Sequence, residues 1–231
     1  MSRRSRSARQ VDHRIRVGRA RSARTEARIL AAGLRVFAEK GPDAPVVDDF
    51  VRAAGIARGT FYNHFQSVQQ LLEATSVWTI DAAVEAIDRA LHDVRRGPGL
   101  RFGTGIRLFL TSAEANPIWC RFVARVWKLG ALEAPRRDLR DGLKKGEFRV
   151  ANAEVAMDVV LGGIREALFR LGNERPPRGY RDRVLEVCLQ ALGAEPALIA
   201  QVLAQELPPL AQPLMDRRSR PASPLEGAVH G

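Results

Sequence analysis

Apolar residues recur along most of the chain at intervals of three and four positions, which is the spacing of amphipathic helices. One such stripe comprises Ile29, Leu30, Gly33, Leu34 and Phe37. It predicts a helix from about Thr25, whose hydroxyl can cap the first turn, to Lys40, where Gly41–Pro42 stops it. Because the chain has no alternating strand pattern of useful length and no internal repeat, we expect an all-α fold.

A long helix is expected from Val68 to about Arg96. Ser67 and Gln70 match the capping box that opens helices, and Gly97–Pro98–Gly99 closes the segment. Shorter helices are expected over Leu100–Ala115, Pro117–Leu129, Pro135–Lys145, Ala153–Leu171, Tyr180–Leu192 and Pro196–Glu206.

The segment from Val47 to Phe65, VDDFVRAAGIARGTFYNHF, has the pattern of two short helices joined by a tight turn. The apolar face of the first helix consists of Val47, Phe50, Val51 and Ala54. Gly55 follows where a helix stops in the left-handed conformation that glycine adopts cheaply. The second helix is expected from about Arg58 to His64, with Phe61 and Phe65 on its buried side.

The outward residues of this second helix are polar groups rather than the Glu, Lys and Ala of an ordinary surface helix. They are Arg58, Gly59, Thr60, Tyr62, Asn63 and His64. Such groups suit phosphate oxygens and base edges, and the layout is that of a helix-turn-helix whose second helix enters the major groove. The spacing alone leaves open an ordinary pair of core helices.

Three stretches resemble the DNA-binding domain of the TetR family of bacterial transcriptional regulators. They are RTEARILAAGLRVFAEKG (Arg24–Gly41), VDDFVRAAGIARGTFYNHF (Val47–Phe65) and the pair Leu71–Leu72, about a fifth of the chain. The resemblance implies a three-helix domain that binds double-stranded DNA, followed by an all-helical ligand-binding and dimerisation domain. The implied DNA-binding residues are Arg24, Val47, Arg58, Gly59, Thr60, Tyr62, Asn63 and His64.

The chain departs from the family pattern at four positions. Family members commonly carry Thr or Ser at the positions of Pro45 and Val46, often Ser at Ala57, and usually Lys at Val68. Each familiar residue would cap a helix or touch phosphate, so we expect fewer DNA-backbone contacts from the motif itself.

Small apolar residues on two late helices indicate a surface for a second copy of the chain, as the family resemblance implies. The expected dimer interface comprises Val155, Val159, Gly162, Gly163, Val184, Val187 and Ala191. The pattern alone leaves open that these helices bury their faces within one chain.

A cluster of aromatic residues is the expected site for a small apolar or amphipathic ligand, since such pockets have apolar, aromatic linings. Its members are Phe102, Phe109, Trp119, Phe122, Trp127 and Phe169. Plain core packing is the alternative for each. Arg107, Arg121, Arg125 and Glu114 are candidates for orienting the ligand.

Composition supports a polyanionic partner and little else. The net charge of +11 favours nucleic acid, although nearly all the basic residues are Arg, as GC-rich coding would also produce. Cys120 and Cys188 lie in apolar helical patterns, which predicts that both are buried as small hydrophobic residues.

The sequence lacks the motifs of an enzyme, a metal site or a membrane span. The four histidines show no metal-ligand spacing, and no nucleophile elbow or nucleotide loop is recognisable. No apolar run could span a membrane. We therefore expect a cytoplasmic protein that is not an enzyme, with no cofactor, no metal and no membrane partner.

The expected organisation has four parts. Residues 1–20 would be a disordered Arg-rich arm, 21–67 the helix-turn-helix domain, 68–206 the ligand-binding and dimerisation domain, and 207–231 a disordered Pro- and Arg-rich tail. The expected function is a homodimeric repressor that binds a palindromic operator and is released by a small molecule. Two alternatives remain: a DNA-binding protein of the same fold without a small-molecule effector, controlled by a protein partner or acting architecturally, and a helical enzyme that has reused the fold.

Overall fold

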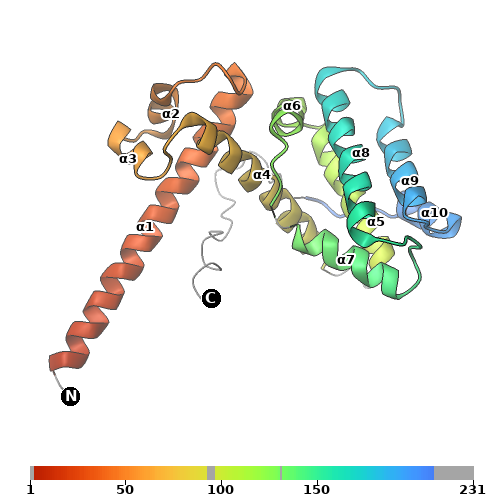
Figure 1. The fold of residues 1–231 in the computed structure, drawn as a ribbon, viewed down its shortest axis with the longest axis horizontal. Helices are drawn as coiled ribbons and strands as arrows, with labels where there is room; N and C mark the ends of the chain where they lie inside the picture. The colour runs from red at the N-terminus through yellow and green to blue at the C-terminus, as the bar shows by residue number, and fades with distance from the viewer. Residues whose placement is uncertain (1–2, 93–96, 131, 211–231) are drawn as a thin grey trace. The chain divides into compact units, whose positions relative to one another are not determined.

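The computed structural model describes residues 3–92, 97–130 and 132–210, with side chains from residue 16 onward except at residue 118. Every regular element in these ranges is a helix, which confirms the all-α fold (Figure 1). The chain divides between Thr75 and Ser76 into two compact units. The division falls inside α4 (Val68–Ala90), later than the boundary at residue 68 that the sequence predicts.

The first unit contains α1 (Arg3–Lys40), α2 (Val47–Ala54), α3 (Arg58–Tyr62) and the start of α4. Three aromatic rings from three helices meet in its core. The ring centroids of Phe37 and Phe50 lie 4.9 Å apart, and those of Phe50 and Phe61 lie 6.3 Å apart. A Cβ atom at Gly33 would lie 2.8 Å from the Thr75 hydroxyl oxygen, so glycine lets α1 pack closely on α4.

The first helix differs from the sequence expectation because it begins at Arg3 rather than near Thr25. Residues 3–20, expected to be disordered, are therefore helical. The Thr25 hydroxyl does not cap the helix but donates to the Arg21 carbonyl oxygen one turn earlier, at 3.1 Å. Arg, Ala and Gln are good helix formers, and this stretch contains no proline. Local propensity thus extends the helix through a segment whose polarity indicated disorder.

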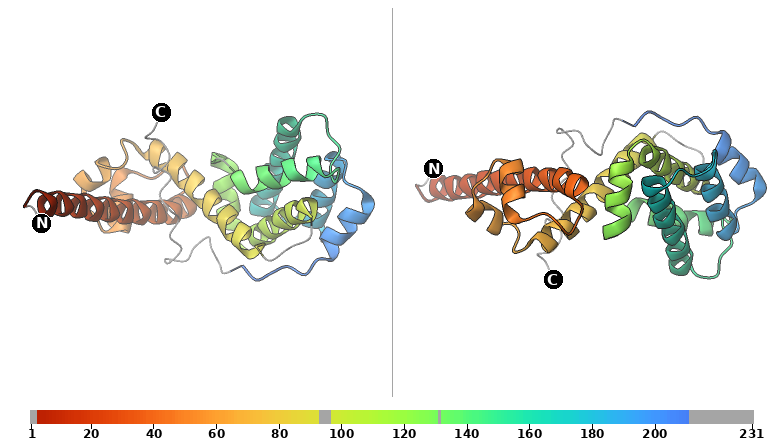
Figure 2. Two further views of the ribbon diagram at one scale, coloured as in Figure 1. Left: turned by 90° about the horizontal axis from the view of Figure 1, so that it is seen from below. Right: turned by 90° about the horizontal axis from the view of Figure 1, so that it is seen from above.

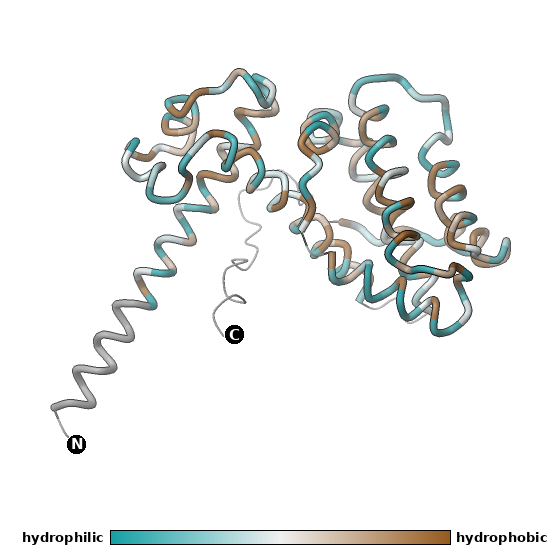
Figure 3. Tube along the Cα trace, in the orientation of Figure 1, coloured by the Kyte–Doolittle hydropathy of each residue, from teal (hydrophilic) through white to brown (hydrophobic). Residues whose placement is uncertain are grey.

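The second unit contains the rest of α4 with α5 (Pro98–Glu114), α6 (Pro117–Val126), α7 (Glu133–Lys144), α8 (Ala153–Asn173), α9 (Tyr180–Ala191) and α10 (Pro196–Ala204). Helix α5 is central, since it packs against every helix from α6 to α10, and α8 packs against both α6 and α9 (Figure 2). Apolar positions recur along each of these helices (Figure 3). The side chains of Leu110, Trp119, Leu139, Phe148 and Leu168 are buried among them.

The start of the predicted disordered tail is also packed. Leu207 and Leu210 are partly buried against Ile87, Leu91 and Leu108. The expectation of disorder is therefore wrong for this stretch. Its prolines indicated disorder, but its two leucines supply apolar surface that packs on the core. Residues 211–231 lie outside the described part of the chain. Within the described residues, no helix combines the length and apolar character needed to cross a bilayer.

Candidate nucleic-acid interface and ligand cavity

Helix α2 ends as the sequence predicts, at a left-handed glycine. Gly55 has φ 61° and ψ 49°, and the amide of Ile56 donates back to the Val51 carbonyl oxygen at 3.1 Å. A Cβ atom at Gly55 would meet nothing within 4 Å, so the backbone conformation, not space, calls for glycine there. This turn fixes the angle between α2 and α3.

Two arginines of α1 hold the same turn from the other side. The Arg28 guanidinium donates to the carbonyl oxygens of Ala54 and Gly55, both at 3.1 Å, and Arg35 donates to that of Ala53 at 3.2 Å. The last carbonyls of a helix have no partner inside the helix. Arg28 and Arg35 therefore cap α2 and fasten it to α1, a role that the sequence analysis did not assign.

The beginning of α2 lacks the usual hydroxyl cap, and an aspartate supplies an alternative. The Asp49 carboxylate accepts the Val46 amide at 3.1 Å and forms ion pairs with Lys40 at 2.7 Å and Arg52 at 3.0 Å. The hydrogen bond from Lys40, followed by that from the Val46 amide, lowers the pKa of the Asp49 carboxyl. The loss of Thr or Ser at positions 45 and 46 is thus offset within the protein.

Helix α3 separates its residues into a buried side and an exposed polar side. Phe61 and Phe65 are buried, whereas Arg58, Gly59, Tyr62 and Asn63 are exposed, with Tyr62 at 47%. Thr60 and His64 are half-buried. Arg58 forms an exposed ion pair with Asp48 of α2 at 3.2 Å. A ligand approaching α3 from outside therefore meets polar groups backed by a rigid aromatic core.

A basic hollow of about 320 Å³ lies beside the first turn of α3. Its lining comprises Arg21, Arg24, Thr25 and Arg28 of α1 with Gly55, Ile56 and Thr60 of the helix-turn-helix. Three arginines and two threonines around one hollow form a composition that suits a phosphate group. Of the predicted DNA-binding residues, Arg24 and Thr60 lie in this hollow, and Val47 is half-buried in α2.

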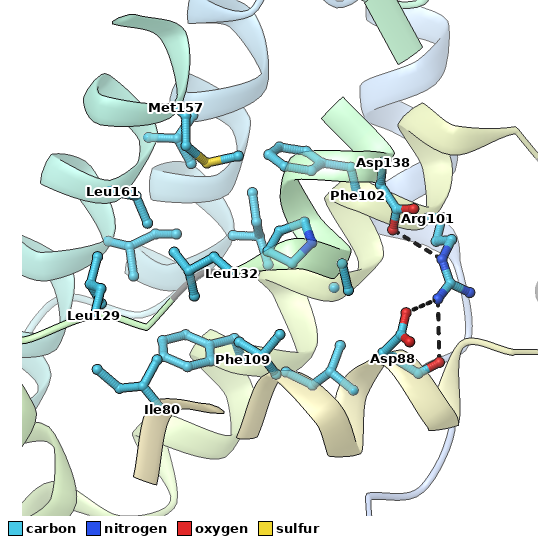
Figure 4. A pocket seen from close by; sticks show the side chains of 18 of the residues that line it. Ile80, Asp88, Arg101, Phe102, Phe109, Leu129, Leu132, Asp138, Met157 and Leu161 are labelled. Carbon is cyan, nitrogen blue, oxygen red and sulfur yellow. Dashed lines mark hydrogen bonds and ion pairs between the residues drawn. The ribbon is translucent and has the colours of Figure 1, made fainter. Parts of the chain in front are cut away.

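The second unit has a partly open cavity of about 90 Å³ between α4, α5, α7 and α8 (Figure 4). Most of its lining is aliphatic or aromatic, including Ile80, Phe102, Phe109, Trp127 and Met157. Phe102, Phe109 and Trp127 were predicted to line a ligand site. Trp119 and Phe122 are buried but do not contribute to the lining, and Trp119 packs edge-on behind Phe109 with ring centroids 5.4 Å apart.

The prediction that Phe169 lines the cavity is wrong. Its side chain is 48% exposed, on the outer face of α8. The inward face of α8 carries Met157, Val160, Leu161 and Ile164 instead. Residues at three- and four-residue spacing define a helical stripe, but the spacing does not indicate which stripe turns toward the chain's own core.

Three charged residues form one end of the cavity. Figure 4 shows Asp88 and Asp138 on either side of the Arg101 guanidinium, whose Nε donates to Asp138 at 2.9 Å and whose Nη2 pairs with Asp88. Arg101 also donates to the carbonyl oxygens of Leu91 and Asp88. Arg137 completes the network through Asp88 at 3.0 Å and Asp138 at 3.1 Å.

The two aspartates respond differently to this environment. Burial raises the pKa of Asp138, and the nearby arginines offset that effect only in part. Burial also acts to raise the pKa of Asp88, but the hydrogen bonds and charges of Arg137 and Arg101 outweigh it, and the pKa is lowered. Asp88 is therefore the firmly ionised carboxylate at the cavity end.

The segment between α6 and α7 contributes to the cavity wall in an unusual backbone conformation. Trp127 has φ 36° and Leu132 has φ 52°, and both side chains line the cavity. A non-glycine residue in the left-handed region costs about 1–2 kcal/mol. Lys128, next to Trp127, is hydrogen-bonded through its backbone to the Ser76 hydroxyl of α4.

The residues proposed from the sequence to orient a ligand have other partners. Arg107 donates to the carbonyl oxygens of Val202 and Gln205, Arg121 to that of Gly172, and Glu114 pairs with Arg181. Arg125 is exposed. Cys120 and Cys188 are free and buried, and burial raises the pKa of the Cys120 thiol to about 12. Among the described residues, no cluster of His, Cys, Asp or Glu has the arrangement of a metal site.

Comparison with known proteins identifies the first unit. The family model described as "Bacterial regulatory proteins, tetR family" matches residues 29–75, which cover α2, α3 and the flanking parts of α1 and α4. The first unit thus carries a helix-turn-helix of the TetR family.

Two curated relatives match part of the chain. The HTH-type transcriptional regulator YvdT of Bacillus subtilis, described as uncharacterized, is 37% identical over 65 residues, 28% of this chain and 34% of the relative. The HTH-type transcriptional regulator EthR of Mycolicibacterium smegmatis is 33% identical over 96 residues, 42% of this chain and 44% of the relative. The matches thus span between about a third and just under half of these relatives.

Solved structures extend the similarity in fold over most of the chain. RolR in complex with resorcinol superposes with a TM-score of 0.65 at 22% identity, covering 83% of this chain and 99% of RolR. FadR from Bacillus subtilis in complex with stearoyl-CoA gives a TM-score of 0.57 at 17% identity, covering 71% of this chain and 97% of FadR. At these identities the likeness concerns the fold.

The residues that the sequence predicts as a dimer interface lie largely on the surface of the second unit. Val155, Val159 and Val187 are 59%, 55% and 61% exposed, and Gly162 and Ala191 are exposed as well. Gly163 and Val184 are half-buried; a Cβ atom at Gly163 would lie 3.3 Å from the Cys188 sulfur, so this glycine serves α8–α9 packing within the chain.

The charged cavity end was not found from the sequence, although one signal was available. Asp88 interrupts the apolar stripe of α4 between Ile87 and Leu91. Arg101 interrupts the apolar stripe at the start of α5, beside Phe102. A charged residue inside an apolar helical stripe requires a partner, and the structure shows that each supplies the other.

Proposed function

We propose that this TetR-family chain is a cytoplasmic transcriptional repressor that binds a palindromic operator as a homodimer and leaves it when a small molecule fills the cavity. The observation that supports DNA binding most directly is the surface of α3. Its exposed Arg58, Tyr62 and Asn63 stand on a core fixed by Phe61 and Phe65, and the basic hollow adjoins its first turn. This combination offers base-reading groups and a phosphate site side by side.

Helix α1 extends the same basic surface toward the N-terminus. Arg16, Arg19, Arg21 and Arg24 are exposed along it. Arginines that neutralise DNA phosphates release counterions and steepen the salt dependence of binding. We assign this part of α1 to sequence-independent backbone contacts, which supplement a motif that lacks polar side chains at Pro45, Val46, Ala57 and Val68.

The exposed apolar residues support dimerisation through α8 and α9. Seven large hydrophobic residues are exposed in the described part of the chain, and four of them, Val155, Val159, Phe169 and Val187, lie on these two helices. The helices pack against each other, so their exposed residues can form one surface. A contiguous exposed apolar patch marks an interaction site, and its self-pairing would place two copies of α3 around a two-fold axis.

Control by a ligand rests on the continuity of α4. Its residues Leu71 and Leu72 are buried in the first unit, and its residues Ile80 and Asp88 line the cavity in the second. A ligand releases DNA only if it binds the non-DNA-binding conformation more tightly. RolR and FadR, which share the fold, were solved with resorcinol and stearoyl-CoA respectively.

One observation favours the alternative of a DNA-binding dimer without a small-molecule effector. The cavity of about 90 Å³ is smaller than the roughly 150 Å³ of a cavity that holds benzene. A ligand of the size of benzene or larger would therefore extend out of the cavity or displace its wall. The left-handed Trp127 and Leu132 are the wall residues whose displacement would relieve backbone strain.

Selection of bound sequences from random double-stranded DNA tests the proposal. The expected result is an enriched palindrome with half-sites about one helical turn or a multiple apart. A pool with no enriched sequence after repeated rounds would exclude an operator-binding regulator and leave the helical-enzyme alternative standing.

A further inference from the structure

The cavity has an unusual polar end, because its charges balance and its donors are already engaged. Arg101 and Arg137 face Asp88 and Asp138, so the network sums to zero charge. A guanidinium carries five N–H donors, and four of those of Arg101 are used by Asp138, Leu91 and Asp88. The charged end of the cavity therefore offers an entering ligand little donor capacity.

The spare capacity at this end is for accepting hydrogen bonds. Both bonds to the Asp88 side chain go to Oδ1, and Oδ2 has no hydrogen-bond partner among the described residues. An ionised carboxylate oxygen accepts strongly and donates nothing. A ligand with an O–H group can donate to it, whereas a ligand carboxylate or phosphate would add a third negative group beside two aspartates.

The rest of the cavity limits the ligand to a compact apolar body. Its wall contains the aromatic side chains of Phe102, Phe109 and Trp127 among aliphatic ones. A charged ligand would leave water for this wall with no free counter-charge, which is costly. The volume of about 90 Å³ is comparable to that of a single ring once the wall moves at Trp127 and Leu132.

We propose that the cavity binds a neutral, one-ring phenol whose hydroxyl donates to Asp88 and whose ring packs among Phe102, Phe109 and Trp127. This assignment rests on the proposed role of the cavity as the effector site. It names a ligand class by chemistry: an apolar ring with a hydroxyl donor, not an acid, an amine or an acyl thioester.

The test uses four probes that share one ring and differ in one substituent: phenol, toluene, benzoate and benzylamine. Calorimetric titration of the full-length protein without DNA should show phenol binding about tenfold more tightly than toluene, which is the scale of a hydrogen bond to a charged group. Benzoate and benzylamine should bind more weakly than either. Benzoate or benzylamine as the tightest probe, or no binding by phenol at millimolar concentration, would overturn the assignment.

A matched pair of variants on α4 tests whether the phenol hydroxyl donates to Asp88. Asp88→Asn should reduce the preference for phenol over toluene to about twofold while toluene affinity is retained, which also shows that the cavity persists. Glu85→Gln, at an exposed position one turn earlier, should keep the tenfold preference. A preference unchanged in Asp88→Asn would contradict the role of Asp88. Because none of these titrations involves DNA, they stand apart from the operator selection, whose failure would refute only the regulatory function.

Discussion

The Ser76 hydroxyl oxygen lies 3.2 Å from the carbonyl oxygen of Lys128 and 3.3 Å from its backbone nitrogen. Ser76 is buried and is the first residue of the second unit within α4, and Lys128 follows the cavity residue Trp127. The cavity wall is thus joined by hydrogen bonds to α4 at the point where that helix leaves the first unit.

The first prediction concerns this link. Ser76→Ala should lower the free energy of unfolding by about 1 kcal/mol, as loss of a buried hydrogen bond does. Affinities for the ligand alone and for the operator alone should change less than twofold, but the ligand should release the operator about fivefold less effectively. Fluorescence anisotropy with labelled operator measures the release. Ser112→Ala, which removes a hydroxyl bonded within α5, is the control and should leave release unchanged; equal effects of the two changes would remove Ser76 from the switch.

The second prediction distinguishes the residues of α3 that bind the operator from those that stabilise the fold. Tyr62→Ala should weaken operator binding while leaving the thermal midpoint nearly intact, because Tyr62 is 47% exposed. Phe61→Ala should instead cost about 3–5 kcal/mol of stability, as large-to-small aromatic changes in cores do. Calorimetry and mobility-shift assays on both variants check this pair. If the two variants exchanged behaviours, the assignment of the faces of α3 would be incorrect.

The third prediction distinguishes two arginines in the basic hollow. Arg28→Ala should destabilise the protein by about 1–3 kcal/mol, because the Ala54 and Gly55 carbonyls lose their donor. Arg24→Ala should leave stability unchanged but reduce the log–log salt slope of DNA binding by about one, as loss of one phosphate contact does. Chemical denaturation and salt-dependent binding provide the readouts. An unchanged salt slope in Arg24→Ala would place that residue away from the phosphates.

The fourth prediction concerns the dimer. Val159→Arg and Val187→Glu should each shift the protein toward monomer, because a charge would be buried without a partner in the interface. Ala200→Arg, at an exposed position of α10, is the control and should leave the dimer intact. Analytical ultracentrifugation measures all three against the wild type. A wild-type chain that sediments as a stable monomer at micromolar concentration would contradict the proposed interface.

Local patterns were sufficient to predict the helix-turn-helix. Gly55 stops α2, and the four-residue spacing of Phe61 and Phe65 places both on the buried side of α3, because glycine conformation and helical periodicity act over a few residues. The same holds for the helix start at Ser67, whose hydroxyl accepts the Gln70 amide at 3.1 Å.

Contacts between distant segments could not be predicted in this way. Arg28 donates hydrogen bonds to carbonyl oxygens 26 and 27 residues away in the sequence. Asp88 forms ion pairs with Arg101 and Arg137, which lie on two other helices. Phe169 was assigned to the cavity although it faces outward, because the direction of a helical stripe depends on how α8 packs. Helix α1 was predicted too short because polarity outweighed helix propensity in residues 3–24.

The most direct test of the account is a titration of the operator complex with a cavity ligand. Labelled operator, obtained by selection, is bound by the full-length protein, and the ligand is added while anisotropy and tryptophan fluorescence are recorded together. We expect the anisotropy to fall to that of free DNA over the concentration range in which the fluorescence reports filling of the cavity beside Trp127. Full occupancy of the cavity with the operator still bound would contradict it.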